Sequence, residues 1–258
     1  MTKELFIKDI MAKPTTISKS AKITEALDKM LEEGIDPLIA LNNTSVVGTV
    51  SREAIAEKLG SRQNTALAPA AIHVASVVKE DFTSVYPDES VNVLIPLLQR
   101  YNLVIVYDND HNLMGQVTAI DLLKKYKYEG SIISAIERAT TIDADERVVH
   151  LRRRMVDDKI SRFVVTSNEK ITGIVTETDI AVAMRKFRET VEDHHQDHRI
   201  RNLRVRDIMS SPLISLETGA GYREVVDLMA SKNISTVPIT ENGKLAGIVT
   251  RRSLVQAI

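Results

Sequence analysis

The sequence lacks cysteine and tryptophan altogether and has only 10 glycines in 258 residues. Without cysteine the chain can form no disulfide, thiolate metal site or thiol nucleophile, a composition that fits a reducing compartment. So few glycines largely exclude the glycine-rich loops that wrap phosphates in many nucleotide-hydrolysing enzymes. The 34 basic and 35 acidic side chains leave a net charge of −1, so we expect no broad nucleic-acid-binding surface.

Long apolar runs are also missing, and none approaches the ~18 residues that cross a bilayer. The first residues carry mixed charges instead of the apolar core of a secretion signal. We therefore expect a cytoplasmic protein without a membrane partner. The sequence has no nucleophile elbow, P-loop, zinc-protease motif or dinucleotide fingerprint, so we expect neither catalytic residues nor enzyme activity.

What the sequence does contain is an eight-residue pattern that occurs four times. An apolar run that starts at glycine ends in serine or threonine, and a helix-prone segment follows it. We call these stretches the marker segments: Gly48–Ile55, Gly115–Leu122, Gly173–Ile180 and Gly247–Leu254. Their glycines lie 67, 58 and 74 residues apart, and such irregular spacing speaks against a solenoid.

Each marker closes a unit of about sixty residues with the expected order β-α-β-β-α. Every unit begins with a short apolar lead segment: Ile7–Met11, Ile72–Val78, Ile132–Ile136 or Val205–Met209. The first helix should end at a residue that tolerates the left-handed conformation, such as Gly34 or Asn233. Pro96 predicts a kinked or shortened first helix in the second unit. Two strands and two one-faced helices cannot bury themselves in sixty residues, so the units should pack in pairs.

We place the four units at residues 1–66, 67–129, 130–190 and 200–258, with a charged linker at 190–200. The Asp-Ile-Met of the first and last leads, the apolar strand and the Gly-x-Val-Thr-x-x-Asp marker resemble the CBS (cystathionine-β-synthase) domain. CBS domains occur in tandem pairs called Bateman modules, so the resemblance implies modules at 1–129 and 130–258. Four copies resemble the gamma subunit of AMP-activated protein kinase and stand-alone archaeal CBS proteins. That resemblance implies an α+β fold whose two modules pack as a disc.

The Thr-x-x-Asp of the marker has two compatible interpretations. At a strand-to-helix junction it forms a capping box, and taken alone this interpretation is favoured. The family resemblance implies in addition that the aspartate accepts hydrogen bonds from both ribose hydroxyls of an adenine nucleotide. The two oxygens of a carboxylate match a vicinal diol, and the threonine hydroxyl and the helix N-terminal amides suit the phosphate side.

Only two of the four markers keep both residues. The second and third units have the complete pairs Thr118 with Asp121 and Thr176 with Asp179. The first unit keeps Ser51 but has Ala54 in place of the acid, and the fourth keeps Thr250 but has Ser253. Alanine accepts no hydrogen bond, and serine offers one neutral oxygen. Glu53 stands one residue early and would point roughly 100° around the helix, so we do not expect it to substitute. We predict one competent site in each module.

Phosphates need positive charge, and the family resemblance implies an arginine just before the second strand of a unit. Arg162 is the only arginine at that position among the four units. Weaker candidates for phosphate binding are the arginines at the helix starts of the first and fourth markers. With the hydroxyls beside them, these are Arg52, Arg251, Arg252, Ser51 and Thr250. For each arginine a solvated surface side chain is the alternative.

The resulting hypothesis is a regulatory protein that binds AMP, ADP or ATP, requires no cofactor and acts on a protein partner. Nucleotide would shift the packing of the modules, in a monomeric disc or a homodimer. One alternative is a ligand-independent protein-interaction scaffold, and another is a nucleic-acid-binding regulator that uses the Arg-rich connector between Arg185 and Arg206. His194 and His198 in that connector have a spacing that can hold zinc, but a flexible charged linker is favoured and we expect no metal site.

Overall fold

The computed structural model describes residues 5–60, 71–128, 130–190 and 202–258. In each unit a short 3-10 helix in the lead is followed by a three-stranded sheet and by helices, in the predicted order. The first strand of each sheet pairs in parallel with the second, and the second pairs antiparallel with the third. The unit boundaries predicted near residues 66, 129 and 190–200 fall in or beside segments outside the described residues and stay predictions.

The first module consists of two units with the same order of elements. The first unit contains β1 (Thr16–Ser18), α1 (Ile23–Glu33), β2 (Leu38–Asn42), β3 (Ser45–Val50) and α2 (Arg52–Gly60). The second contains β4 (Ser84–Val85), α3 (Leu94–Arg100), β5 (Leu103–Tyr107), β6 (Leu113–Thr118) and α4 (Ala119–Lys125). Their leads form 3-10 helices at Ile7–Asp9 and Val74–Ser76.

The second module repeats this order. The third unit contains β7 (Thr141–Asp143), α5 (Val148–Asp157), β8 (Arg162–Ser167), β9 (Lys170–Thr176) and α6 (Glu177–Thr190). The fourth contains β10 (Leu216–Glu217), α8 (Tyr222–Ser231), β11 (Thr236–Glu241), β12 (Lys244–Thr250) and α9 (Arg251–Ala257). Their leads form 3-10 helices at Ile132–Ala135 and Val205–Asp207.

The structure confirms the predictions for the residues that end the first helices and for the proline in the second unit. Gly34 and Asn233 follow α1 and α8 with φ of 66° and 49°, in the left-handed region. Pro96 lies in α3, which has 7 residues where α1 has 11, and a 3-10 helix at Val91–Val93 precedes it. Proline has no N–H for the helix ladder, which explains the shortened helix.

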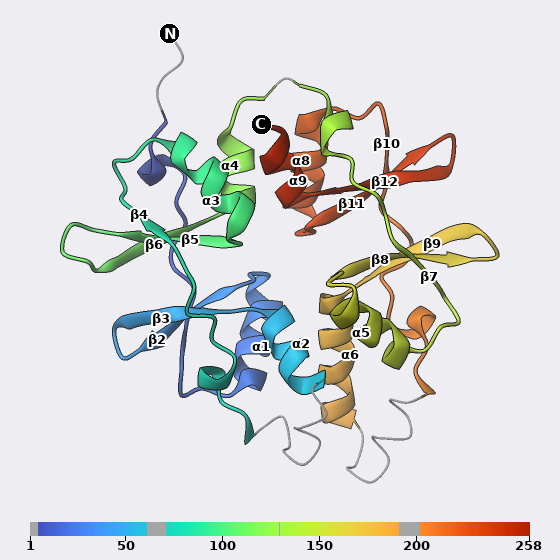
Figure 1. Cartoon of the computed structure of the whole chain (residues 1–258), viewed down its shortest axis with the longest axis horizontal. Coiled ribbons are helices and arrows are strands. Elements are labelled where there is room, and N and C mark those ends of the chain that lie inside the picture. Colours follow the sequence, from blue (N-terminus) through green and yellow to red (C-terminus); the bar gives the residue numbers. More distant parts are fainter. Residues whose placement is uncertain (1–4, 61–70, 129, 191–201) are drawn as a thin grey trace.

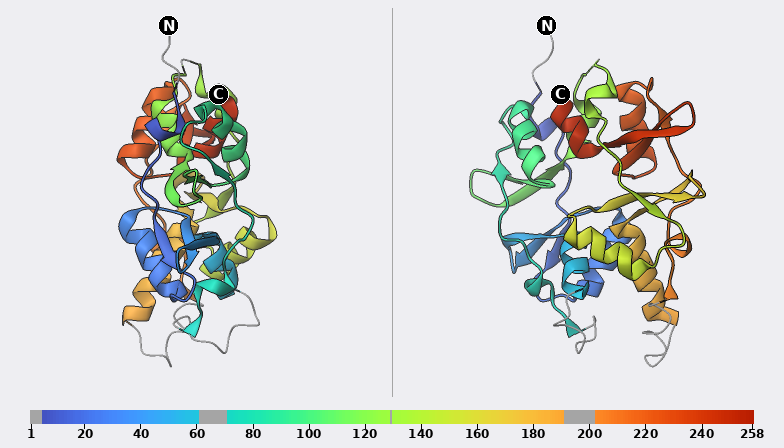
Figure 2. Two further views of the ribbon diagram at one scale, coloured as in Figure 1. Left: turned by 90° about the vertical axis from the view of Figure 1, so that its left-hand side faces the viewer. Right: turned by 45° about the vertical axis from the view of Figure 1, so that its right-hand side comes forward.

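The four units form the quadrants of a flat disc (Figure 1), seen in further views in Figure 2. Within the first module the two sheets face each other and share an apolar cluster that includes Ile39, Leu103 and Ile105. Between the modules the contacts are helical: α2 packs against α6, α3 against α9, and α4 against both α8 and α9. Among the described helices, none has the length and apolar character needed to cross a bilayer.

The leads are exchanged within each module. Ile7 and Ile10 of the first lead lie in the apolar core of the second unit, and Val74 of the second lead lies in the core of the first. The second module repeats the exchange, with Ile132 in the core of the fourth unit and Val205 in that of the third. Each described unit therefore completes its core with a segment of its neighbour.

The same exchange explains the marker glycines. After crossing to the neighbouring unit, each lead forms a β-bridge with the residue that follows a marker glycine. The four bridges are Thr49 with Lys79, Gln116 with Ala12, Ile174 with Ser210, and Ile248 with Glu137. A Cβ on Gly173 would lie 2.6 Å from the carbonyl oxygen of Ser210, and one on Gly247 would lie 2.5 Å from that of Glu137. Any side chain here would push the lead away from the strand.

We predict that Gly173→Ala destabilises the protein by about 1–3 kcal/mol, because the added Cβ overlaps the backbone of the exchanged lead. Gly219→Ala is the matched control: no atom lies within 4 Å of its ideal Cβ, and we expect a change within about 0.5 kcal/mol. Urea unfolding of both variants gives the two free energies. Equal losses would contradict the role of close backbone approach.

Candidate nucleotide-binding hollow

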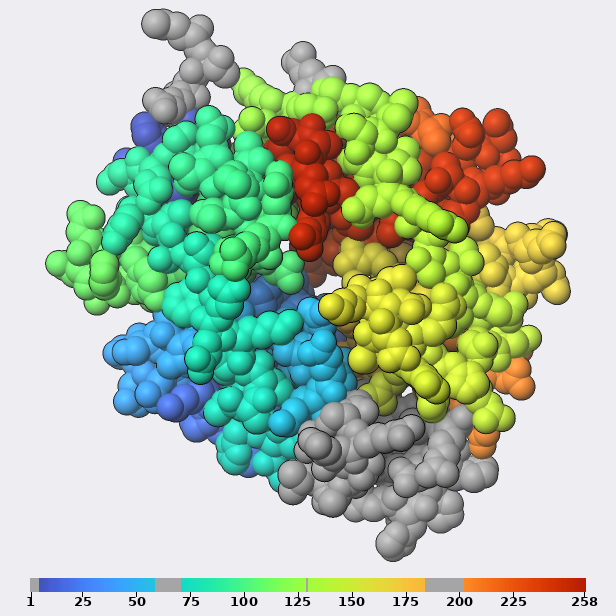
Figure 3. All heavy atoms as spheres, in the orientation of Figure 1, coloured from blue at the N-terminus to red at the C-terminus, as the bar shows by residue number. Residues whose placement is uncertain are grey.

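A hollow of about 620 Å³ lies at the centre of the disc, a size within the usual range for small-molecule sites. Figure 3 shows the face of the disc on which the four units surround it. The first turns of α2, α4, α6 and α9 all line it, so the marker segments of all four units meet there. The lining marker residues are Ser51, Arg52, Glu53, Thr118, Ala119, Ile174, Thr176, Glu177, Thr178, Asp179, Thr250, Arg251 and Arg252.

The hollow extends between the marker of the third unit and the exchanged lead of the fourth. We call each such contact a junction and number it by the unit that supplies the marker. On the marker side of the third junction the lining includes Thr176 and Asp179, and on the lead side it includes Ser210, Pro212 and Ile214. Within the described part of the chain, the third junction is the one in which both the marker and the bridging lead residue line the hollow.

The carboxylate of Asp179 divides its two oxygens between two tasks. Oδ2 accepts hydrogen bonds from the backbone N–H and the hydroxyl of Thr176, both at 2.7 Å, and so caps α6. Oδ1 accepts a hydrogen bond of 2.6 Å from the hydroxyl of Ser210 on the exchanged lead. Capping therefore uses one oxygen of the carboxylate, and the other is directed at the exchanged lead.

Asp121 repeats this geometry in the second junction with one difference. Its Oδ2 accepts from the backbone N–H of Thr118 at 2.8 Å and from the Thr118 hydroxyl at 2.6 Å. The lead residue opposite is Ala12, which has no hydroxyl to donate. Among the described residues, none donates a hydrogen bond to Oδ1 of Asp121, so that acceptor is available.

The first and fourth markers keep the cap and lose the acid. Ser51 Oγ accepts from the N–H of Ala54 at 3.1 Å. In the fourth marker the N–H of Thr250 donates to Ser253 Oγ, and the N–H of Ser253 donates to Thr250 Oγ1, each at 2.9 Å. Ser253 is 3% exposed, and its hydroxyl also donates to the backbone carbonyl of Thr250, so it presents no charged acceptor to a ligand.

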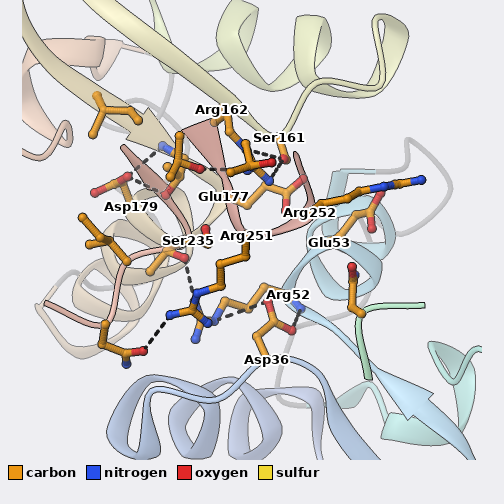
Figure 4. Close-up of a pocket in the computed structure, with 18 of the residues that line it drawn as sticks. Asp36, Arg52, Glu53, Ser161, Arg162, Glu177, Asp179, Ser235, Arg251 and Arg252 are labelled. Carbon is orange, nitrogen blue, oxygen red and sulfur yellow. Dashed lines mark hydrogen bonds and ion pairs between the residues drawn. The ribbon is translucent and has the colours of Figure 1, made fainter. Parts of the chain in front are cut away.

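Arg52 crosses from the first unit to the third. Its Nη1 donates to the hydroxyl of Thr178 at 2.6 Å, and its Nη2 donates to the carbonyl of Met30 at 3.0 Å. Its Nε lies 3.9 Å from Oδ2 of Asp36 (Figure 4). Arg52 of the first module thus donates a hydrogen bond to the residue that precedes Asp179 in the third marker.

Arg162, the arginine singled out before the second strand, joins the two units of its own module. Its Nη1 donates to the Thr236 hydroxyl at 2.7 Å, and its Nε and Nη2 donate to Ser161 Oγ. Burial lowers the pKa of Arg162, while Glu177 and Glu137 act in the opposite direction. It lines the hollow with its neighbour Ser161 (Figure 4).

Arg251 lines the hollow with a poorly satisfied guanidinium. Its Nε is buried and has no hydrogen-bond acceptor within the described part of the chain, and the same is true of Arg52 Nε. The Nη2 of Arg251 makes a long contact of 3.4 Å with Asn233 Oδ1. Burial lowers the pKa of Arg251, Asp121 raises it, and Arg52 lowers it further. Arg252 beside it is exposed, in keeping with the surface alternative.

Glu177 was missed by the sequence interpretation. Burial, followed by repulsion from Glu53 and Asp36, raises the pKa of its carboxyl to about 7, although Arg162 opposes this shift. The signal was present in the marker segments, where the residue after the capping serine or threonine is Arg52, Ala119, Glu177 or Arg251. Comparison of that position across the four units shows a charged residue in three of them.

No group of three or more potential metal ligands occurs among the described residues. The histidines His194 and His198 and half of the Arg-rich connector lie outside the described residues. Of its basic residues near the fourth lead, Arg204 and Arg206 both pair with Asp145.

Comparison with protein-family models matches the CBS domain at residues 7–61, 74–128, 132–186 and 205–258. Among curated proteins, the chain is 22% identical over 270 residues to the uncharacterized protein MJ1225 of Methanocaldococcus jannaschii, covering 96% of this chain and 95% of the relative. It is 23% identical over 266 residues to the uncharacterized protein MJ1404 of the same organism, covering 99% of this chain and 61% of that protein.

Solved structures give the same result for the fold. The crystal structure of MJ1225, whose description proposes homology to g-AMPK, matches with a TM-score of 0.82 at 22% identity, covering 98% of this chain and 99% of that one. An uncharacterized conserved protein from Pyrococcus horikoshii matches with a TM-score of 0.64 at 21% identity, with coverage of 98% and 99%. These findings confirm the predicted α+β fold of four CBS domains.

The raised pKa of Glu177 makes the folded state bind more protons than the unfolded state between about pH 4.5 and about pH 7. Wild-type stability should therefore fall as the pH rises through this window. Glu177→Gln has no charge to bury, so we expect it to be more stable than wild type by about 1–2 kcal/mol at pH 8, allowing for partial exposure.

Urea unfolding at pH 4.5 and pH 8 measures this difference. The advantage of Glu177→Gln should shrink at the lower pH, where wild-type Glu177 is protonated. Glu224→Gln, an exposed position on α8, controls for the loss of one acid. The same advantage at both pH values would contradict the raised pKa.

Proposed function

This chain belongs to the CBS domain family and carries the domain four times, and on that premise we propose that it is a regulatory sensor of AMP, ADP or ATP. The nucleotide binds at the junctions that keep the marker aspartate, with its phosphates toward the central hollow. Proteins built only of CBS domains generally regulate and do not catalyse, so the output is a change in a partner protein. No further cofactor is needed for this role.

The observation that carries the proposal is the buried, unpaired Nε of Arg251 in the hollow. A buried donor of a charged group that lacks an acceptor is costly, and an anionic group that accepts from it removes this cost. Its Nε has no acceptor among the described residues, and Arg52 lies near enough to lower its pKa. A phosphate group offers several charged acceptor oxygens to such a pair.

The ribose end of the ligand fits the free oxygens of the marker acids. Asp121 Oδ1 is available, and Asp179 Oδ1 is engaged by the Ser210 hydroxyl, which can rotate. A ribose hydroxyl that donates to a carboxylate forms a charge-assisted hydrogen bond, stronger than one to a neutral acceptor. The ligand is therefore held at one end by a carboxylate and at the other by arginine.

The two ends of the ligand would be held by different modules. Arg52 of the first module contacts Thr178 beside Asp179, and the charge of Asp121 in the first module raises the pKa of Arg251 in the second. A nucleotide at either acid would then bridge both modules through its phosphate. If its affinity differs between two packings of the modules, binding shifts the population between them and changes the surface offered to a partner.

Calorimetric titration of ligand-free protein with AMP, ADP and ATP tests the sites. We expect about two nucleotides per chain, and Asp121→Ala and Asp179→Ala should each lose one of them, because each removes one ribose acceptor. Ser253→Ala is the matched control, since it removes the capping side chain at the same marker position and should leave both sites. A wild type that binds none of the three would favour the ligand-independent scaffold instead.

The arginine has its own test. Arg251→Gln should weaken the binding of AMP and ATP by about tenfold, through loss of a charge-assisted contact, and should affect adenosine much less because it has no phosphate. Arg153→Gln, on the exposed side of α5, is the control for loss of one positive charge. Equal weakening of adenosine and AMP would show that Arg251 acts on the fold of the hollow and not on the phosphate.

A further inference from the structure

The four junctions differ at one equivalent position of the exchanged lead. The residue that bridges the strand just after the marker glycine is Ala12, Lys79, Glu137 or Ser210. At the junctions that keep the aspartate this residue is small and uncharged, Ala12 opposite Asp121 and Ser210 opposite Asp179. At the two junctions that lack the acid it is long and charged.

Each charged lead residue contacts the marker opposite. In the fourth junction the hydroxyl of Thr250 donates to Oε2 of Glu137 at 3.3 Å. In the first junction Nζ of Lys79 lies 3.5 Å from Oε2 of Glu53, the residue next to Ala54. In these two junctions the charged group next to the marker therefore comes from the lead. In the two junctions predicted to bind nucleotide it comes from the marker itself, as Asp121 or Asp179.

We infer that this lead position decides which junctions accept a nucleotide, and that Glu137 closes the fourth junction independently of the missing aspartate. The inference rests on the proposed function and deepens it. Glu137 accepts the hydrogen bond of the Thr250 hydroxyl, which is then not available to a ligand. Its charge also raises the pKa of Arg162. A carboxylate there repels a phosphate and would also repel an aspartate restored at position 253.

Small lead residues act differently. Ala12 donates no hydrogen bond to Oδ1 of Asp121. The Ser210 hydroxyl can rotate away from Oδ1 of Asp179, and it is itself uncharged. Glu137, by contrast, brings a carboxylate into its junction. Restoring the acid is consequently insufficient in the fourth junction, and the lead residue has to change as well.

The test is a count of AMP sites by calorimetry on ligand-free full-length protein. Ser253→Asp alone should keep the wild-type count of about two, whereas Ser253→Asp combined with Glu137→Ala should gain a third. The pair Ser253→Asp and Glu137→Gln keeps the size of the side chain and removes its charge, and it replaces the first pair if alanine impairs folding. A third site with Ser253→Asp alone, or none with either pair, would overturn the inference.

The reciprocal variant is the matched control. Ala12→Glu places the carboxylate of the fourth junction into the second, so it should remove the site at Asp121 and leave the one at Asp179. Retention of both sites would overturn the inference while leaving the proposed function intact. A wild type without any AMP site would overturn the proposed function and this inference with it, so the two failures are distinguishable.

Discussion

The crossing of each lead over the neighbouring marker strand is the contact on which the rest of the structure depends. It brings a carbonyl oxygen so close to the marker strand that only glycine fits, as at Gly173 and Gly247. It also inserts apolar side chains, Ile7 and Val205 among them, into the core of the neighbouring unit. The pairing of units is thus a condition of their folding, because a unit without the exchanged lead has an incomplete core.

Once the units are paired in this way, the direction of the marker strands follows. Each strand ends beside a first helical turn, and helix packing between the modules brings the four turns to one centre. The centre gathers cations such as Arg251 and acids such as Glu177, whose pKa values are shifted first by burial and then by neighbouring charges. An anion bound in this hollow would act on both the cations and the acids that line it.

Sequence reasoning succeeds here wherever the cause is local. The left-handed backbone at Gly34 and the short helix at Pro96 follow from the properties of single residues, and the repeat reveals the unit order. It fails where the partner is distant along the chain. Ser210 bonds to Asp179 and Arg52 reaches Thr178, contacts that span 31 and 126 residues and leave no periodicity in the sequence. The raised pKa of Glu177 comes first from burial and then from Glu53 and Asp36, which belong to the first unit and are equally distant in the sequence.

The lead exchange has a consequence for symmetry. A single unit carries both a lead and the surface that receives one, so two identical chains could satisfy each other around a twofold axis, and every junction would then be the same. When four units are joined in one polypeptide, the junctions no longer have to be identical. The position held by Ala12 in one junction can hold Glu137 in another, so a pseudo-symmetric scaffold can keep some junctions open and others shut without any change in its fold.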